Sequence, residues 1–203
     1  MKTQYLFFST LMLILQASCK KDSREAASYT IDEDASKIEW KGSAPDHFHT
    51  GAFSVKGYFK TDKNGQITGG DFIIPITSIR NYDLPDDQKE LLLADLKGTN
   101  FFNVAVHPKA EFHITSVTAY KGGDATVVEG ANYLITGDFS MIGQSHPLSF
   151  PVRIKKDDRN LQTSAIFKLN RLQWGMKSYN DPTKPLYLLP EVEITLNIES
   201  EKQ

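Results

Sequence analysis

Apolar and polar side chains alternate along most of the chain, which is the period of a β-strand with one buried face. Ile38 and Trp40, for example, alternate with charged neighbours. The pattern predicts about eight strands, which fall within residues 37–41, 53–60, 72–76, 112–115, 132–141, 148–155, 161–169 and 191–199. Such alternation is typical of antiparallel sheets, in which one face packs on a core and the other meets water.

Turn and helix signals separate these strands. Asn64-Gly65 is a strong hairpin signal. Pro75 has no amide donor, so its strand is expected to be irregular or at an edge there. The segment "DLPDDQKELLLADLKG" carries Pro85 and two acids at its start and Gly98 at its end, which predicts one helix. Leu92 and Leu96 lie on one helix face, with Leu91 beside them.

Two architectures suit an all-β chain of this kind, a sandwich or a closed barrel. Periodicity does not separate them, and by itself it favours a packed core. A barrel of about eight strands is just wide enough to be filled by side chains or to hold one small ligand. Gly57 and Gly137 leave gaps in the apolar faces, which suit either a bend of the barrel or space for a guest molecule.

The N-terminus has the layout of a secretory signal peptide: Lys2, an apolar run over 5–15, then small residues. The run is too short to span a bilayer as a helix. Cys19, the only cysteine, follows at once, as in a bacterial lipoprotein signal, although Gln16 stands where Leu is usual. We expect a signal peptide over 1–18, a lipidated Cys19 with a polar tether over 19–28, and a protein exported to the periplasmic side or cell surface, anchored to the outer membrane.

Composition narrows the function classes. Removal of residues 1–18 takes away one charge, Lys2, and changes the net charge from −2 to −3. A mildly acidic chain without a basic stripe is a poor nucleic-acid ligand. The sequence has no G-x-S-x-G nucleophile motif and no glycine-rich phosphate loop between a strand and a helix. We therefore expect no enzyme activity and no cofactor, and nothing in the sequence opposes a homo-oligomer.

Several distinctive segments follow one another over roughly residues 29–198: "YTIDEDASKIEWKGS", "HFHTGAFSVKGYF", "GGDFIIPITSI", "LKGTNFFNVAVHPKAEFHITSV", "YLITGDFSMIGQSHPLSFPV" and "NRLQWGMKSYN" with "EVEITLNI". In this order they resemble the YceI-like family. The resemblance implies an antiparallel eight-stranded, lipocalin-like barrel over 29–200, with the short helix between strands 3 and 4. It also implies an apolar interior that binds a polyisoprenoid or similar long amphiphile. The chain has Asn103 and Asn170 where members often carry Asp.

Given a barrel, the apolar faces supply the expected cavity lining. These residues are Phe53, Val55, Phe59, Phe72, Ile74, Ile76, Phe112, Ile114, Tyr133, Ile135, Phe139, Phe150 and Val152. A long isoprenoid tail needs only such a dry channel, because each buried methylene contributes about 0.8 kcal/mol. The alternative is that these side chains fill their own barrel, which then serves as a periplasmic or surface interaction module without a lipid ligand.

Three residues are candidates for contact with a ligand head at the barrel mouth: His49, Arg171 and Trp174. His47 and His49 share one face of a strand, and two imidazoles supply two of the four ligands of a zinc site. No third and fourth ligand are evident in the sequence, so we expect no metal. Arg171 suits either an acidic head group or a salt bridge with a neighbouring acid. In the segment "KPLYLLPE" (184–191), Leu186, Tyr187 and Leu188 are candidates for closing the mouth, as is the leucine face of the helix. The alternative is that the helix simply caps one end of the barrel.

Overall fold

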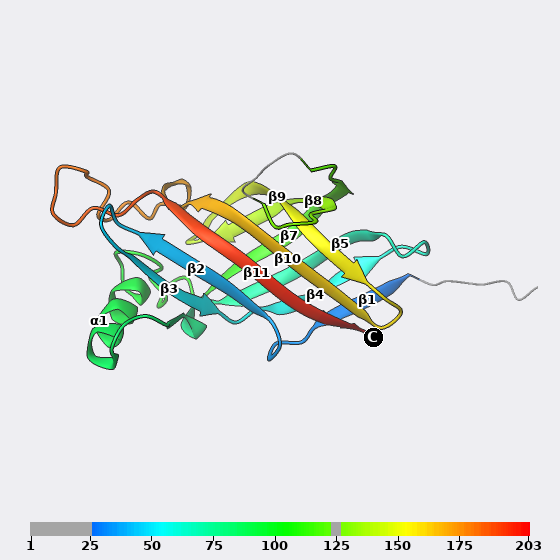
Figure 1. Ribbon diagram of the computed structural model, residues 1–203. Helices are drawn as coiled ribbons and strands as arrows, with labels where there is room; N and C mark the ends of the chain where they lie inside the picture. The colour runs from blue at the N-terminus through cyan, green and yellow to red at the C-terminus, as the bar shows by residue number, and fades with distance from the viewer. Residues whose placement is uncertain (1–25, 123–126) are drawn as a thin grey trace, which may run out of the picture.

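The computed structural model describes residues 26–122 and 127–203, and its main element is one antiparallel sheet that closes on itself (Figure 1). The predicted signal peptide and Cys19 lie outside the described residues. The strands are β1 (Ala27–Ile31), β2 (Lys37–Ser43), β3 (Phe48–Phe53), β4 (Lys56–Thr61), β5 (Ile67–Pro75), β6 (Arg80–Asn81), β7 (Lys109–Ala119), β8 (Tyr133–Met141), β9 (Gln144–Lys156), β10 (Asn160–Asn170) and β11 (Glu191–Lys202).

The closed sheet is an eight-stranded barrel, as the family resemblance implied. β1 and β2 both pair with β11, so they form two halves of one barrel strand. β4 pairs with β1 and β3 pairs with β2, so β3 and β4 form the two halves of the next barrel strand. The remaining strands β5, β7, β8, β9, β10 and β11 follow in chain order. Pairing of β1 with β11 closes the ring, so no strand of the barrel exposes an unpaired edge along its whole length.

The two ends of the barrel differ. One end, which we call the helix end, carries α1 (Asp86–Lys97), the short helices η1 (Ile76–Ser78) and η2 (Arg171–Trp174), and the long 175–190 connection; it lies at the left of Figure 1. At the other, the terminal end, β1 begins and β11 finishes. The helix stands between the third and fourth barrel strands, as predicted. No helix of the described residues is long and apolar enough to span a bilayer.

Local sequence signals explain the main turns. Gly65 adopts φ +77° in the hairpin between β4 and β5, as Asn64-Gly65 predicted. Pro75 is the last residue of β5, where a missing amide donor disturbs the ladder least. The predicted tether over 19–28 is too long by two residues, because Ala27 and Ser28 pair with Thr61 and Lys60 and begin β1.

The interior glycines serve the barrel's shape rather than a guest. Gly57 has φ +145°, a backbone conformation that only glycine adopts readily, at the junction of β3 and β4. At Gly137 a Cβ atom would lie 2.4 Å from the His113 carbonyl oxygen and 2.5 Å from the Phe112 ring. The Phe112 ring therefore covers the glycine beside the β-bulge in β7.

We expect Gly137→Ala to lower the free energy of unfolding by about 2 kcal/mol, because the added methyl overpacks a rigid backbone and a ring. Gly42→Ala is the matched control, since a Cβ there meets no atom within 4 Å. Chemical denaturation of both variants checks the prediction. Equal stability of the two would contradict the close packing at Gly137.

Candidate functional site

The barrel encloses an apolar cavity of 410 Å³ that reaches the surface at the helix end. This volume is within the range of about 300–1,000 Å³ that is common for ligand pockets. Its wall is built from the inward-facing residues of nearly every strand, together with α1 and the 175–190 connection. An alternating sheet rolled into a barrel thus turns its apolar faces into one continuous channel.

Eleven of the thirteen residues expected from the sequence line this cavity: Phe53, Val55, Phe59, Phe72, Ile74, Ile76, Phe112, Ile114, Ile135, Phe139 and Phe150. Their rings form edge-on and tilted pairs, such as Phe59 with Phe72, whose centroids are 4.8 Å apart. The wall is therefore a set of interlocked rings and methyl groups that offers dispersion contacts and few hydrogen bonds.

Tyr133 and Val152 were expected in the lining, but they do not line the cavity. The two residues pair with each other across β8 and β9 near the terminal end. There Val152 and Leu161 are fully buried, and side chains fill the barrel. Alternation predicts which way a side chain faces, but not how deep the cavity extends along the strand.

Other lining residues were missed. Phe167 and Trp40 stand on alternating strands and had the same signal as those chosen. Phe101 and Met176 belong to irregular segments and had no periodic signal at all. Trp40 Nε1 and Thr163 Oγ1 are buried without a hydrogen-bond partner in the described chain, and both residues are part of the wall.

Apolar side chains from two segments cover the helix end. Leu92 and Leu96 of α1 contribute to the cavity wall, whereas Leu91 points into solvent and is 74% exposed. On the 175–190 connection, Leu186 and Leu188 also line the cavity. Both segments proposed from the sequence for closing the mouth are thus present there, although Tyr187 and Leu91 are not part of the wall.

His47 and His49 lie together at the mouth, with ring centroids 5.4 Å apart, and both line the cavity. His49 Nδ1 is 2.7 Å from Asp83 Oδ2. Burial by itself would raise the pKa of Asp83, but hydrogen bonds from His49, the Thr50 amide and Asn81 hold that pKa below its usual value. Asp83 therefore stays ionised and orients His49, whose Nε2 is left for a ligand or water.

Arg171 is 3% exposed and uses all five guanidinium donors on backbone carbonyls. It donates to one side of the 175–190 connection at Met176, Ser178 and Tyr179, and to the other side at Leu188 and Leu189. No donor remains for a head group and, within the described chain, no carboxylate pairs with it. Both roles considered from the sequence are replaced by a third, which is to hold the two sides of the connection together.

Trp174 is a packing residue rather than part of the mouth. It is 1% exposed, does not line the cavity, and its Nε1 donates to the Phe139 carbonyl at 3.0 Å. Its ring meets those of Phe139 and His146 edge-on. Nearby, Asn170 Oδ1 accepts from the Leu172 amide at 3.0 Å, so the amide side chain caps η2.

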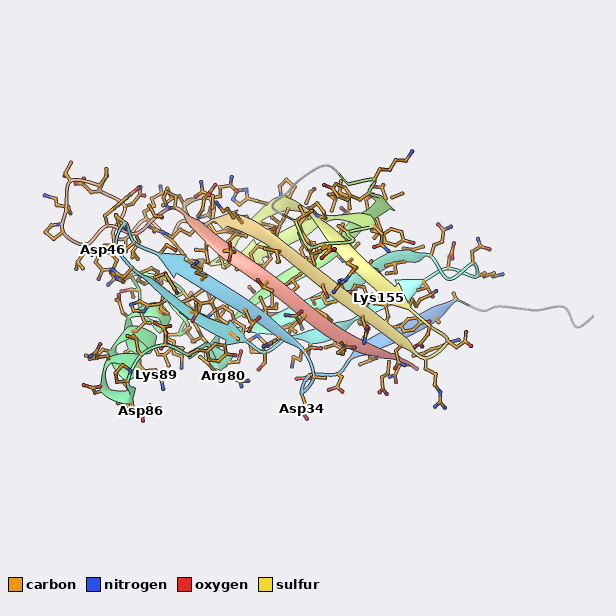
Figure 2. All side chains as sticks on the ribbon, in the orientation of Figure 1. Asp34, Asp46, Arg80, Asp86, Lys89 and Lys155 are labelled. Atoms are coloured by element: carbon orange, nitrogen blue, oxygen red, sulfur yellow. The ribbon has the colours of Figure 1, made fainter. Side chains whose placement is uncertain are left out.

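The polar groups at the helix end come from widely separated segments. Figure 2 shows Asp46 at the end of the β2–β3 hairpin and Asp86 and Lys89 on α1, all at this end of the barrel. Asp95 of α1 lines the cavity and accepts a hydrogen bond from Asn100 at 2.8 Å. Residues 26–122 and 127–203 contain no group of three or more His, Cys, Asp or Glu side chains that could hold a metal ion.

Comparison with known proteins gives one family and a set of similar barrels. The model of the YceI-like domain family matches residues 29–200. BcnA of Burkholderia cenocepacia is 18% identical, with a TM-score of 0.63 over 83% of this chain and 98% of that one. A polyisoprenoid-binding domain from Saccharophagus degradans is 10% identical, with the same TM-score over 86% of this chain and 98% of that one. Comparison with curated proteins finds no match.

Proposed function

Because the chain belongs to the YceI-like domain family, we propose that it binds a long apolar amphiphile in the barrel cavity and carries or stores it. The observation that supports this most is the 410 Å³ apolar cavity, open at one end and lined by aromatic and branched side chains. A polyisoprenoid or a quinone with a prenyl tail suits this apolar lining, because the methyl-rich chain has no hydrogen-bonding groups along its length. The similar domain from Saccharophagus degradans is described as polyisoprenoid-binding.

Binding follows from transfer of the tail out of water. Each methylene that enters the cavity contributes about 0.8 kcal/mol, so a long tail binds tightly without polar contacts. The head stays at the mouth, where polar side chains join the apolar lining. We propose no chemical reaction. A fully packed interaction module, the alternative, would leave no cavity of this size.

The large exposed apolar side chains support loading of the ligand from a lipid bilayer. Among the described residues they all belong to segments around the helix end: Phe48, Tyr82, Leu91, Val106, Leu186 and Leu189, with exposures between 38% and 74%. Leu186 and Leu189 also line the cavity, so these two continue its apolar surface outward. A tail that crosses from a bilayer over these side chains avoids water on the way.

We further propose that the protein is exported and anchored through a lipidated Cys19 in the outer membrane. The support is the sequence of residues 1–19 together with the position of β1, whose first residue lies at the terminal end, away from the mouth. The segment from Cys19 to Ala27 spans at most about 28 Å when extended. That reach lets the barrel lie along a membrane, with its mouth near the lipid surface.

The experiment that tests the function is purification of the protein from cells without added lipid, solvent extraction, and mass spectrometry of the extract. We expect a stoichiometric prenyl lipid or quinone. If gentle purification repeatedly yields protein without organic ligand, and the purified barrel takes up no prenyl lipid, the carrier function is wrong.

We expect Leu91→Glu with Val106→Glu to slow transfer of a fluorescent prenyl lipid from phosphatidylcholine vesicles about tenfold, because charged side chains resist contact with an apolar phase. Neither residue lines the cavity, so equilibrium binding of the same lipid delivered from ethanol should be unchanged. Thr118→Glu with Thr30→Glu, on exposed barrel positions, is the control pair. Equal transfer rates for all three proteins would contradict bilayer loading through the helix end.

A further inference from the structure

An open hollow of 620 Å³ adjoins the mouth of the barrel cavity. Its wall is formed by residues of the segment from Lys177 to Leu186. Tyr179 and Leu186 belong to both the hollow and the cavity, so the two spaces share a wall. A molecule whose tail occupies the cavity therefore reaches this hollow when its polar end lies on the Tyr179 and Leu186 side of the mouth.

The hollow carries more positive than negative charge. Lys177 and Lys184 line it, both are exposed, and neither forms an ion pair within the described residues. Asp181 is its only carboxylate-bearing lining residue. The Thr183 hydroxyl and the Thr183 amide donate to Asp181 Oδ1 at 2.7 and 2.9 Å and lower the pKa of that carboxyl, so it remains ionised. Two cations thus face one anion that is already hydrogen-bonded.

Arg171 adds a second source of positive potential behind this wall. Its Nη2 lies 3.5 Å from the carbonyl oxygen of Tyr179, the residue shared by hollow and cavity. Burial lowers the pKa of Arg171, but a guanidinium stays protonated in proteins. The backbone carbonyls accept the hydrogen bonds of the Arg171 guanidinium, but they are neutral groups, so its positive charge remains. Because the charge is buried, water screens it little, and it favours an anion on the outer side of Tyr179.

Another part of the mouth has the opposite character. His47 and His49 are each bonded to a carboxylate, Asp46 and Asp83, at 2.7 Å. An anionic head on that side would meet these two carboxylates. The charges at the mouth therefore direct an anion toward the Lys177–Leu186 segment and away from the histidines.

We infer that the Lys177–Leu186 hollow is a binding site for an anionic oxygen-rich head, of the phosphate class, on the amphiphile whose tail occupies the barrel. This inference rests on the proposed function, because the tail must be held in the cavity. Lys177 and Lys184 contact the phosphate oxygens, and Arg171 acts through its field and by holding the segment in place.

The test compares two probes with the same tail, geranylgeranyl phosphate and geranylgeraniol, by tryptophan-fluorescence titration. Wild-type protein is expected to bind the phosphate more tightly, and only that affinity should fall as salt increases. Lys177→Gln with Lys184→Gln should weaken the phosphate about tenfold and leave the alcohol unchanged. Lys56→Gln with Lys155→Gln removes the same charge from exposed sites on β4 and β9 and serves as the control pair.

The outcomes separate the two hypotheses. The head-group site is wrong if the Lys177 and Lys184 variant binds the phosphate as tightly as wild type, or if the control pair loses as much affinity. In that case binding of geranylgeraniol still supports the carrier function. If wild-type protein binds neither probe, the proposed function fails, and the head-group site fails with it.

Discussion

Replacing Phe139 with glutamate is expected to reduce the affinity for a prenyl lipid by at least about a hundredfold. Phe139 lines the cavity, and its ring packs edge-on against Trp174, with the centroids 5.4 Å apart. A carboxylate there keeps its hydration water, and a tail must either displace that water or give up the contacts in that part of the cavity. Both choices cost far more than the loss of one ring contact.

The measurement is titration of each variant with geranylgeraniol, with circular dichroism as a check of folding. Phe139→Leu keeps an apolar side chain and is expected to bind within a fewfold of wild type. Ile135→Glu places the same charge elsewhere in the cavity wall and should also lose binding. A folded Phe139→Glu protein that retains its lipid would show that the tail does not occupy this cavity.

Replacing Arg171 with methionine is expected to lower the free energy of unfolding by about 3 kcal/mol. The methionine fills part of the volume, but five carbonyl oxygens of the 175–190 connection lose their donors. Buried acceptors without partners are costly, so the connection should open and take water. Lipid should then dissociate faster, because Leu186 and Leu188 no longer cover the mouth.

Three readouts check this. Chemical denaturation reports the stability, limited proteolysis reports opening of the 175–190 connection, and the dissociation rate of a fluorescent prenyl lipid reports the mouth. Arg171→Lys keeps the charge but has three donors in place of five, so it should fall between wild type and Arg171→Met. If Arg171→Lys matches wild type in all three measurements, the charge rather than the five hydrogen bonds holds the connection.

Much of the barrel wall could be predicted from the sequence. The period of two placed Phe72, Ile74 and Phe112 on inward faces, and the turn chemistry at Asn64-Gly65 joined β4 to β5. The helix over 86–97 followed from its terminal residues. These features depend on neighbours in the chain, so a single sequence carries them. Alternation alone left sandwich and barrel open, and the family resemblance decided between them.

The functional end of the molecule depended on contacts between distant segments. Only the tertiary structure brings Asp83 to His49, or stops the cavity before Tyr133 and Val152. Arg171 is the clearest case, because the partners of a buried cation are carbonyl oxygens, which every residue has and no sequence pattern marks. The sequence by itself determined which side chains face inward. How far the cavity extends, what covers it and where its charges meet were decided by packing between segments that are far apart in the chain.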